Sequence, residues 1–159
     1  MKRARTAADL ATRAQIAELT GREFIEAILA GDLAAAPIAE TLGLALHEVG
    51  EGRVVFRGVP SLSVYNPIGT VHGGWFGTLL DSCMACAVQT ALPKGFAYTT
   101  LEFKVNIIRP LFEHSGAVLA IGDATHVGRR TGVAEGRIIG EDDGKLYATG
   151  STTCLVMEL

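Results

Sequence analysis

The chain has 159 residues, which fits a single domain large enough to bury a hydrophobic core. Hydrophobic residues make up 48% of the composition and charged residues 19%, which excludes a disordered chain and indicates that some apolar surface is buried between subunits. The net charge of -3 lacks the basic excess of proteins that neutralise nucleic-acid phosphates. We therefore expect a globular oligomer without a nucleic-acid partner.

The three cysteines, Cys83, Cys86 and Cys154, are an odd number and form no zinc-ligand set with the histidines. Cys83 and Cys86 lie inside an apolar run, where thiols act as small core or interface residues more often than as a redox pair. The basic N-terminus is not followed by the apolar stretch of a secretory signal. We expect free thiols, no bound metal and a cytoplasmic protein.

Residues 6–30 are predicted to be helical because apolar residues recur at helical spacing, with an interruption near Thr20-Gly21 and an end at Gly31-Asp32. Residues 1–35 should therefore form an N-terminal helical extension, followed by the main domain at residues 36–159. In that domain, residues 40–49 and 53–57 flank a glycine turn and predict two strands of a hairpin. Residues 58–70 have the composition of a loop, with a turn at Asn66-Pro67.

Residues 71–91 form a continuous, mostly apolar run that ends at a proline and a glycine, which predicts a buried helix. The run is about long enough to cross a bilayer. Three glycines and an aspartate at its centre, whose insertion would cost about 2.5–3.5 kcal/mol, favour a helix surrounded by protein.

Four long strands are predicted after this helix, at residues 96–109, 116–127, 132–140 and 145–157, separated by three turn signals. The simplest arrangement is a meander. Together with the earlier hairpin, the strands predict an α+β fold in which a curved antiparallel sheet holds the long helix on its concave face.

Asp81 is the only formally charged residue between Val71 and Pro93, although aspartate is unfavourable both inside helices and in buried positions. It either faces a solvent channel, caps a nearby loop or has a chemical role. His72-Gly73-Gly74 stands at the start of the same helix, where backbone amides lack intrahelical partners. The Gly73 amide could there stabilise the oxyanion of a thioester, a contribution of about 10²–10³ in rate. Close packing is the alternative explanation for the glycines.

Eight residues separate Gly73 from Asp81, which is about 12 Å along a helix axis. One helix cannot bring both groups to the same carbonyl. If two such helices pack antiparallel about a two-fold axis, the N-terminus of one lies beside the third turn of the other. We therefore expect two equivalent sites that are shared between subunits.

The segment from Asn66 to Gly74, followed by Asp81, resembles the N-x-x-G-x-x-H-G-G…D signature of hotdog-fold thioesterases of the phenylacetate-degradation (PaaI-like) group, over roughly residues 40–157. The resemblance implies an α+β hotdog fold in which a six-stranded antiparallel sheet wraps a long central helix, here with an extra N-terminal helix. It also implies a homodimer, commonly doubled to a homotetramer. The expected activity is hydrolysis of an acyl-CoA to free acid and CoA, without a metal or other cofactor.

The resemblance also assigns roles to the motif residues. Asp81 would act as a general base for water or as a nucleophile, and either role requires an ionised carboxylate. Asn66 would position the water or the carbonyl, the Gly73 amide would polarise the carbonyl, and His72 would orient the loop rather than transfer protons. A hydroxyl of Thr99 or Thr100 would hold the water, with Thr100 the closer match, although threonine is also common in strands for packing.

Substrate-binding residues follow less directly from the resemblance. The turn at Arg129, Arg130 and Thr131 would lie near the CoA phosphates, which arginine binds well. It could equally be a solvated hairpin tip, and other basic residues compete for this role: Arg57, Lys104 and Arg109. The acyl pocket is expected to be lined by Gly74 and by the aromatic residues Tyr65, Trp75 and Phe76, although these aromatic residues could instead be core. Residues 1–35 would cover the pocket or form a subunit contact.

Thioester hydrolysis is the leading functional hypothesis, with either an aromatic acyl group of the phenylacetyl or hydroxybenzoyl type or a medium-chain acyl group. The main alternative is a non-catalytic domain of the same fold that binds acyl-CoA, which would not require Asp81. A dehydratase would normally combine a histidine with an acidic residue, and a purely structural protein would leave a buried aspartate unexplained.

Overall fold

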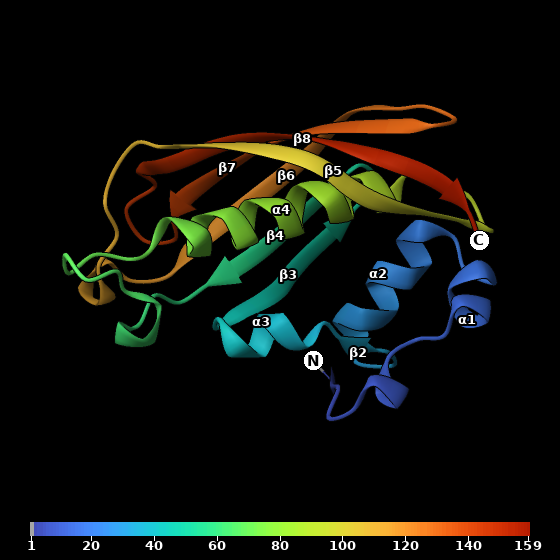
Figure 1. Cartoon of the computed structure of the whole chain (residues 1–159), viewed down its shortest axis with the longest axis horizontal. Helices are drawn as coiled ribbons and strands as arrows, with labels where there is room; N and C mark the ends of the chain where they lie inside the picture. Colours follow the sequence, from blue (N-terminus) through green and yellow to red (C-terminus); the bar gives the residue numbers. More distant parts are fainter. Residues whose placement is uncertain (1) are drawn as a thin grey trace.

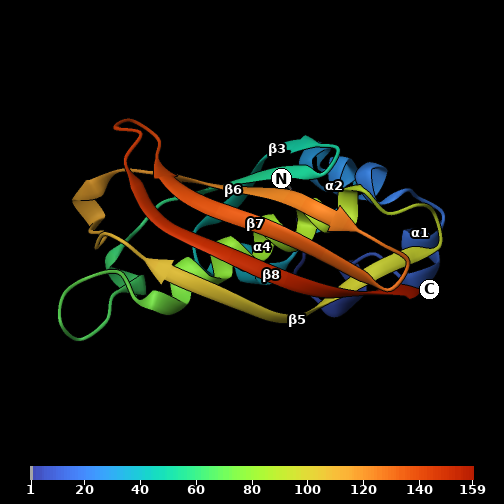
Figure 2. The ribbon, with the colours of Figure 1, turned by 90° about the horizontal axis from the view of Figure 1, so that it is seen from above.

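In the computed structural model, which describes residues 2–159, the long helix α4 (Gly73–Thr90) lies across the concave face of an antiparallel sheet (Figures 1 and 2). All five strand pairings of this six-stranded sheet are antiparallel. The strand order is β3 (Leu44–Gly50), β4 (Arg53–Gly58), β6 (Val118–Val127), β7 (Thr131–Gly140), β8 (Leu146–Glu158) and β5 (Phe96–Ile107). The predicted hotdog arrangement of helix and sheet is confirmed.

The prediction of a four-stranded meander is wrong for its first strand. Strands β6, β7 and β8 do follow one another as neighbours, but β5 pairs with β8, and β6 pairs with β4 instead. Turn composition shows where a strand ends, but the partner of the next strand is set by packing over the whole sheet. As a result β5 lies at an edge, and its second edge has no partner strand within residues 2–159.

Helix α4 supplies the centre of the hydrophobic core, as its apolar sequence predicts. It begins at Gly73 and ends at Thr90, within two residues of the predicted limits. Cys83 is fully buried, as expected of a small core residue. The largest side chains that α4 buries are Trp75, Phe76, Leu79, Leu80 and Met84, and they belong to the same core cluster as Val118, Ala120, Ala134 and Ile138 of the sheet.

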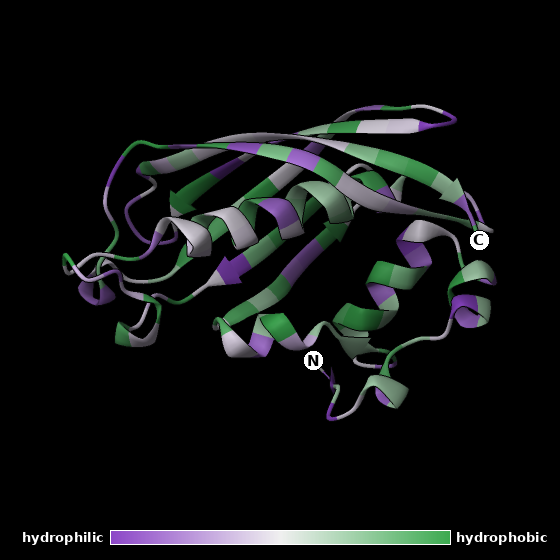
Figure 3. Ribbon diagram, in the orientation of Figure 1, coloured by the Kyte–Doolittle hydropathy of each residue, from purple (hydrophilic) through white to green (hydrophobic). Residues whose placement is uncertain are grey.

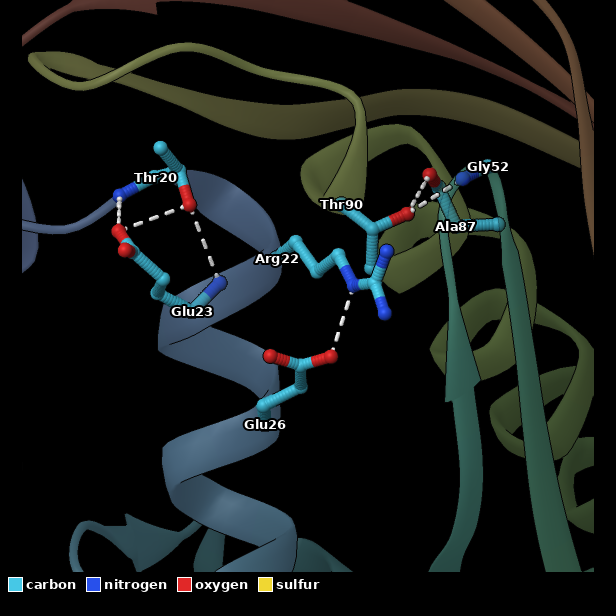
Figure 4. A network of polar contacts seen from close by, with 7 residues as sticks. All are labelled: Thr20, Arg22, Glu23, Glu26, Gly52, Ala87 and Thr90. Carbon is cyan, nitrogen blue, oxygen red and sulfur yellow. Dashed lines mark hydrogen bonds and ion pairs between the residues drawn. The ribbon is translucent and has the colours of Figure 1, made fainter.

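The N-terminal segment folds as three short helices rather than one helix with a single interruption: η1 (Ala7–Asp9), α1 (Arg13–Ala17) and α2 (Gly21–Ala30). Thr12 and Thr20 cause the breaks, because each has extended backbone angles and accepts a hydrogen bond from an amide of the following helix. Figure 4 shows this cap at Thr20, whose hydroxyl accepts a hydrogen bond from the Glu23 amide. The Thr20 amide in turn donates a hydrogen bond to the Glu23 carboxylate. Helix α2 ends at Gly31, whose φ of 90° suits glycine.

Helix α2 packs closely against the end of α4. The Gly21 amide donates to the Leu92 carbonyl at 2.9 Å, and a Cβ at Gly21 would lie 1.7 Å from the Gln89 carbonyl oxygen, so only glycine fits there. Ile25 is 3% exposed and packs with Leu46, Val54 and Ala87. Figure 3 shows the apolar and polar bands that alternate along α2. The extension therefore shares a core with the sheet and α4.

Short elements complete the extension. Strand β1 (Lys2–Arg3) pairs in parallel with β2 (Ala34–Ala35), and the unpredicted helix α3 (Pro37–Thr41) begins with a proline at its first position.

The Thr90 hydroxyl donates to the Ala87 carbonyl and accepts from the Gly52 amide, which joins α4 to the β3–β4 turn (Figure 4). Within residues 2–159 no helix combines the length and apolarity needed to cross a membrane.

Candidate active site

Asp81 lies in the third turn of α4 with its side chain half-buried between the helix and strand β5. The Thr100 hydroxyl donates a hydrogen bond to Asp81 Oδ1 at 2.9 Å. Burial raises the pKa of the Asp81 carboxyl, and the bond from Thr100 offsets part of this effect because it favours the ionised form. Of the two neighbouring threonines, Thr100 is the one that contacts the carboxylate, whereas Thr99 is exposed.

Asp81 lines a mostly apolar cavity of about 180 Å³. The cavity extends from the carboxylate toward the N-terminal extension, and its walls come from seven elements of the fold. The lining residues are Ile25, Ile28, Ala35, Ala36, Ile38, Ala39, Leu46, Phe56, Ser82, Ala85, Cys86 and Tyr98, together with Asp81. An apolar cavity beside a carboxylate is suited to an acyl group whose carbonyl is to be attacked.

The N-terminus of α4 presents a free backbone donor. His72 is the N-cap residue, and its Nδ1 accepts a hydrogen bond from the Gly74 amide at 2.9 Å. The Gly73 amide has no hydrogen-bond partner within residues 2–159, because it belongs to the first turn of the helix. The exposed His72 thus holds the helix start in place and leaves one amide available, which agrees with the expected orienting role.

A second cavity, of about 280 Å³, opens at this end of α4. It is lined by Asn66, Thr70, Val71, Gly73, Phe76, Ile107, Ile108, Arg109 and Pro110. The Asn66 side chain closes its own loop, since Oδ1 accepts from the Ile68 and Thr70 amides and Nδ2 donates to Thr70 Oγ1. Its second Nδ2 hydrogen is left to bind a water molecule or a carbonyl.

The two cavities share no lining residue. Because α4 is one continuous helix, Gly73 and Asp81 are separated by about 12 Å along its axis. Within one chain the carboxylate and the free amide therefore cannot contact the same carbonyl group.

The aromatic residues near the motif are mostly structural. The Trp75 side chain is buried in the core, where Nε1 donates to the Leu42 carbonyl at 2.9 Å, and the Tyr65 hydroxyl accepts from the Glu113 amide at 2.5 Å. Neither residue lines either cavity, so the structure does not bring Trp75 and Tyr65 to the site as expected. Phe76 lines the cavity at Gly73, and Gly74 is exposed beside His72.

The expected phosphate-binding turn is exposed. Arg129, Arg130 and Thr131 lie at the junction of β6 and β7, and Arg129 borders a further cavity at the C-terminal end of α4. Neither arginine forms an ion pair within the described residues 2–159. Among the competing residues, Arg57 is paired with Glu141, whereas Arg109 lines the cavity at Gly73. Lys104 lies elsewhere, in a polar depression with Asp123 and Arg137.

Sequence reasoning missed several residues around Asp81, although simple spacing could have found some of them. Ala85 follows Asp81 by four positions and Cys86 follows Ser82 by four, so these residues form two adjacent rows on the helix surface, and both rows line the cavity. Tyr98 precedes Thr100 by two positions on β5, so both point to the same face of the sheet. The Tyr98 hydroxyl lies 3.9 Å from Cys86 Sγ.

Metal ligands do not gather at this site. No group of three or more histidine, cysteine, aspartate or glutamate side chains in residues 2–159 is arranged to hold a metal ion. The polar groups found along α4 are the Asp81 carboxylate with the Thr100 hydroxyl and, at the helix N-terminus, the free Gly73 amide.

Comparison with known proteins identifies the family. The sequence profile of the thioesterase superfamily matches residues 68–147, which include the start of α4, Asp81 and Thr100. The chain belongs to the thioesterase superfamily. The expectation from the Asn66–Asp81 motif is thereby confirmed at the level of the family.

Two curated relatives extend the match. A Halobacterium salinarum protein with the provisional name of esterase is 34% identical over 100 residues, covering 59% of this chain and 64% of that protein. The chain thus spans less than two thirds of that relative. The 1,4-dihydroxy-2-naphthoyl-CoA hydrolase of Listeria monocytogenes is 26% identical over 119 residues, covering 75% of this chain and 94% of the hydrolase.

Solved structures place this chain among the PaaI-like proteins. A mutant of the phenylacetic acid degradation protein PaaI from Thermus thermophilus is 30% identical, with a TM-score of 0.67, covering 76% of this chain and 98% of that one. The PaaI protein of E. coli covers 92% of this chain and 96% of its own with a TM-score of 0.71, and its 21% identity supports the shared fold.

Proposed function

We propose that this protein hydrolyses acyl-CoA thioesters to a free acid and CoA, with Asp81 as general base or nucleophile. The observation that carries this proposal is the half-buried Asp81 carboxylate, held by Thr100 beside an apolar cavity in a member of the thioesterase superfamily. A desolvated carboxylate without such a use would only weaken the fold.

Both roles of Asp81 give balanced chemistry. As a general base, the carboxylate takes a proton from water while the water oxygen attacks the thioester carbon. As a nucleophile, Oδ of the carboxylate attacks that carbon, and water then hydrolyses the mixed anhydride. In either case the carbon–sulfur bond breaks and the CoA thiolate takes up a proton. The reaction needs a carboxylate, a water molecule and an oxyanion donor, so we propose that it proceeds without a metal or other cofactor.

The Gly73 amide is the proposed oxyanion donor, and it would come from a second copy of the chain. Strand β5 has an open edge, and its exposed apolar side chains include Leu101 (59% exposed) and Phe103 (45%). Pairing of β5 with the same strand of a partner about a two-fold axis would cover these side chains and set the two α4 helices antiparallel. Gly73 and Asn66 of one subunit would then approach Asp81 of the other. A homodimer is the minimum assembly in this proposal, and a homotetramer doubles it.

The substrate class follows from the relatives and the cavity. The Listeria relative is named for an aromatic acyl-CoA, and the PaaI structures for phenylacetic acid degradation. We propose an aromatic or medium-chain acyl group in the Asp81 cavity, with CoA phosphates bound by surface arginines such as Arg129 and Arg130, in a protein of the cytoplasm.

A panel of acyl-CoA esters tests this function. The purified protein should release free CoA thiol from at least one aromatic or medium-chain ester, and Asp81→Asn should not. Binding of the esters without thiol release would favour the non-catalytic alternative. Equal release by wild type and Asp81→Asn would remove Asp81 from the mechanism.

A further inference from the structure

The N-terminal extension and helix α3, which follows it, together form one side of the Asp81 cavity. Ile25 and Ile28 of α2, Ala35 of β2, and Ala36, Ile38 and Ala39 at helix α3 all line it, opposite Asp81 and Ser82. These six residues lie outside the segment that matches the superfamily profile, residues 68–147. This side of the cavity therefore comes from a part of the chain that the superfamily profile does not match.

We propose that the N-terminal extension and helix α3 together set the acyl specificity of this enzyme by closing the pocket at the size of one aromatic ring, with Ile28 and Ala36 as specificity-determining residues. This inference rests on the proposed thioesterase function, because it assigns the acyl group to the cavity beside Asp81. It sets an upper limit on acyl size, which admits a single ring or a tail of similar volume and excludes longer medium-chain tails such as decanoyl.

The volume of the cavity supports this size. An apolar cavity of about 150 Å³ holds one benzene molecule, or about 25 Å³ for each carbon atom. By that ratio the cavity of about 180 Å³ takes roughly seven carbon atoms. A benzyl group has that size, with the thioester carbonyl left at Asp81. The nine-carbon tail of a decanoyl group exceeds it.

The chemistry of the wall agrees with an apolar ring. On the side of the extension, the six lining residues are isoleucines and alanines. Polar atoms enter the cavity from the opposite side, at Asp81, Ser82, Cys86 and Tyr98 on α4 and β5. An acyl group bound with its carbonyl at Asp81 would therefore extend toward α2 and end against Ile28 and its neighbours.

Packing and hydrogen bonds hold this wall in place. Gly21 contacts the Gln89 carbonyl region without space for a side chain, and Ile25 is buried in a shared core. At the other end, Ala39 of α3 is buried in the main core together with Leu44 of β3 and Trp75 of α4. Since both ends are attached to the body of the fold, the wall acts as a fixed limit on acyl length.

Two substitutions should shift the specificity in opposite directions. Ile28→Ala enlarges the cavity, and Ala36→Leu fills it from an exposed position where the added side chain leaves the core unchanged. One methylene in a hydrophobic pocket changes selectivity by about 10–200-fold. Relative to wild type, Ile28→Ala should raise the ratio of kcat/KM for decanoyl-CoA over phenylacetyl-CoA by about tenfold or more. Ala36→Leu should lower kcat/KM for phenylacetyl-CoA at least tenfold relative to acetyl-CoA.

Leu29→Ala is the matched control, because Leu29 neighbours Ile28 on α2 but does not line the cavity. It should leave both ratios within about twofold of wild type. The proposal is overturned if Ile28→Ala and Leu29→Ala give the same ratio, or if wild type prefers decanoyl-CoA.

Binding separates this inference from the hydrolytic function. In Asp81→Asn, which should bind without turnover, titration calorimetry should show phenylacetyl-CoA binding at least tenfold more tightly than decanoyl-CoA, with the preference reduced by Ile28→Ala. Such a result would support the pocket even if wild type released no thiol, an outcome that would contradict the proposed hydrolysis alone. Equal affinities for the two esters would contradict the pocket even in an active enzyme.

Discussion

The two cavities along α4 have complementary contents. The one at Asp81 is apolar and contains a carboxylate, with the N-terminal extension as one wall. The one at the helix N-terminus has a free backbone amide and an asparagine, and no aspartate or glutamate lines it. One has a base without an oxyanion donor, and the other has a donor without a base. In the proposed mechanism, each chain therefore builds two half-sites, and a complete site requires the end of one α4 beside the middle of another.

Removing the carboxylate should have the largest effect. Asp81→Asn keeps the shape of the side chain and can still accept from Thr100, but it cannot act as a base or nucleophile. We expect kcat for the best ester to fall by about 10²–10⁴-fold, as measured by thiol release.

The same variant should be more stable than wild type at neutral pH. Burial raises the pKa of Asp81 in the folded state, so the wild-type protein loses stability when this carboxyl ionises at higher pH. The asparagine side chain of the variant does not ionise, so the variant avoids this loss. The difference in melting temperature should shrink as the pH falls and Asp81 becomes protonated. An unstable Asp81→Asn protein at neutral pH would mean that the carboxylate is there to support the fold.

Removing the amide donor should have the next largest effect. Gly73 is the first residue of α4, where proline is well tolerated, and the preceding His72 has extended angles that suit it. Gly73→Pro should therefore fold but lose about 10²–10³ in kcat. Gly73→Ala is the control, because it keeps the amide and its Cβ would lie at an ordinary 3.4 Å from Ile107. Equal losses in both variants would show that space, rather than the amide, is what matters at Gly73.

Thr100 should affect the pH dependence more than the maximal rate. Its hydrogen bond favours the ionised form of Asp81, so Thr100→Val should raise the pKa of the carboxyl further. Since the ionised form is the active one, the acid limb of the kcat/KM profile should move to higher pH. Thr99→Val, which alters the exposed neighbour, should leave the profile in place. An unchanged acid limb in Thr100→Val would assign that limb to another group.

The smallest effect on rate is expected at His72. His72→Ala removes the acceptor for the Gly74 amide and should cost about 0.5–2 kcal/mol of stability in chemical denaturation. His72→Asn can restore the cap and should recover most of this loss. Because His72 orients the helix start, kcat should fall less than tenfold in both variants. A loss of a hundredfold or more would indicate proton transfer by the imidazole.

Local patterns in the sequence predicted the helix and the strand segments, whereas non-local packing decided what they failed to predict. The apolar run of α4 and the glycine turns could be predicted because each is determined by residues that are close together in the sequence. The position of β5 at the sheet edge depends on β8, which follows it by about forty residues. The three-part N-terminal helix depends on side-chain caps at Thr12 and Thr20, which apolar spacing does not reveal.

The candidate site was likewise predictable where it depends on local sequence and unpredictable where it depends on tertiary packing. Asp81, Gly73 and their separation followed from the motif and the rise of a helix, and the choice of Thr100 over Thr99 agrees with the hydrogen bond. Trp75 stands six residues before Asp81, about two-thirds of a turn around the helix, so it faces the core instead. Ile28 and Tyr98 reach the cavity only through tertiary packing, so the local sequence could not place them there.

Complementation between two inactive variants tests the shared site most directly. Asp81→Asn and Gly73→Pro chains with different affinity tags can be co-expressed and purified as heterodimers. In a shared site, one of the two sites in each heterodimer receives both lesions and the other receives neither, so the heterodimer should recover about half of wild-type activity. If each chain carries its own complete site, every site keeps one lesion, and heterodimers as inactive as the two parents would contradict the account.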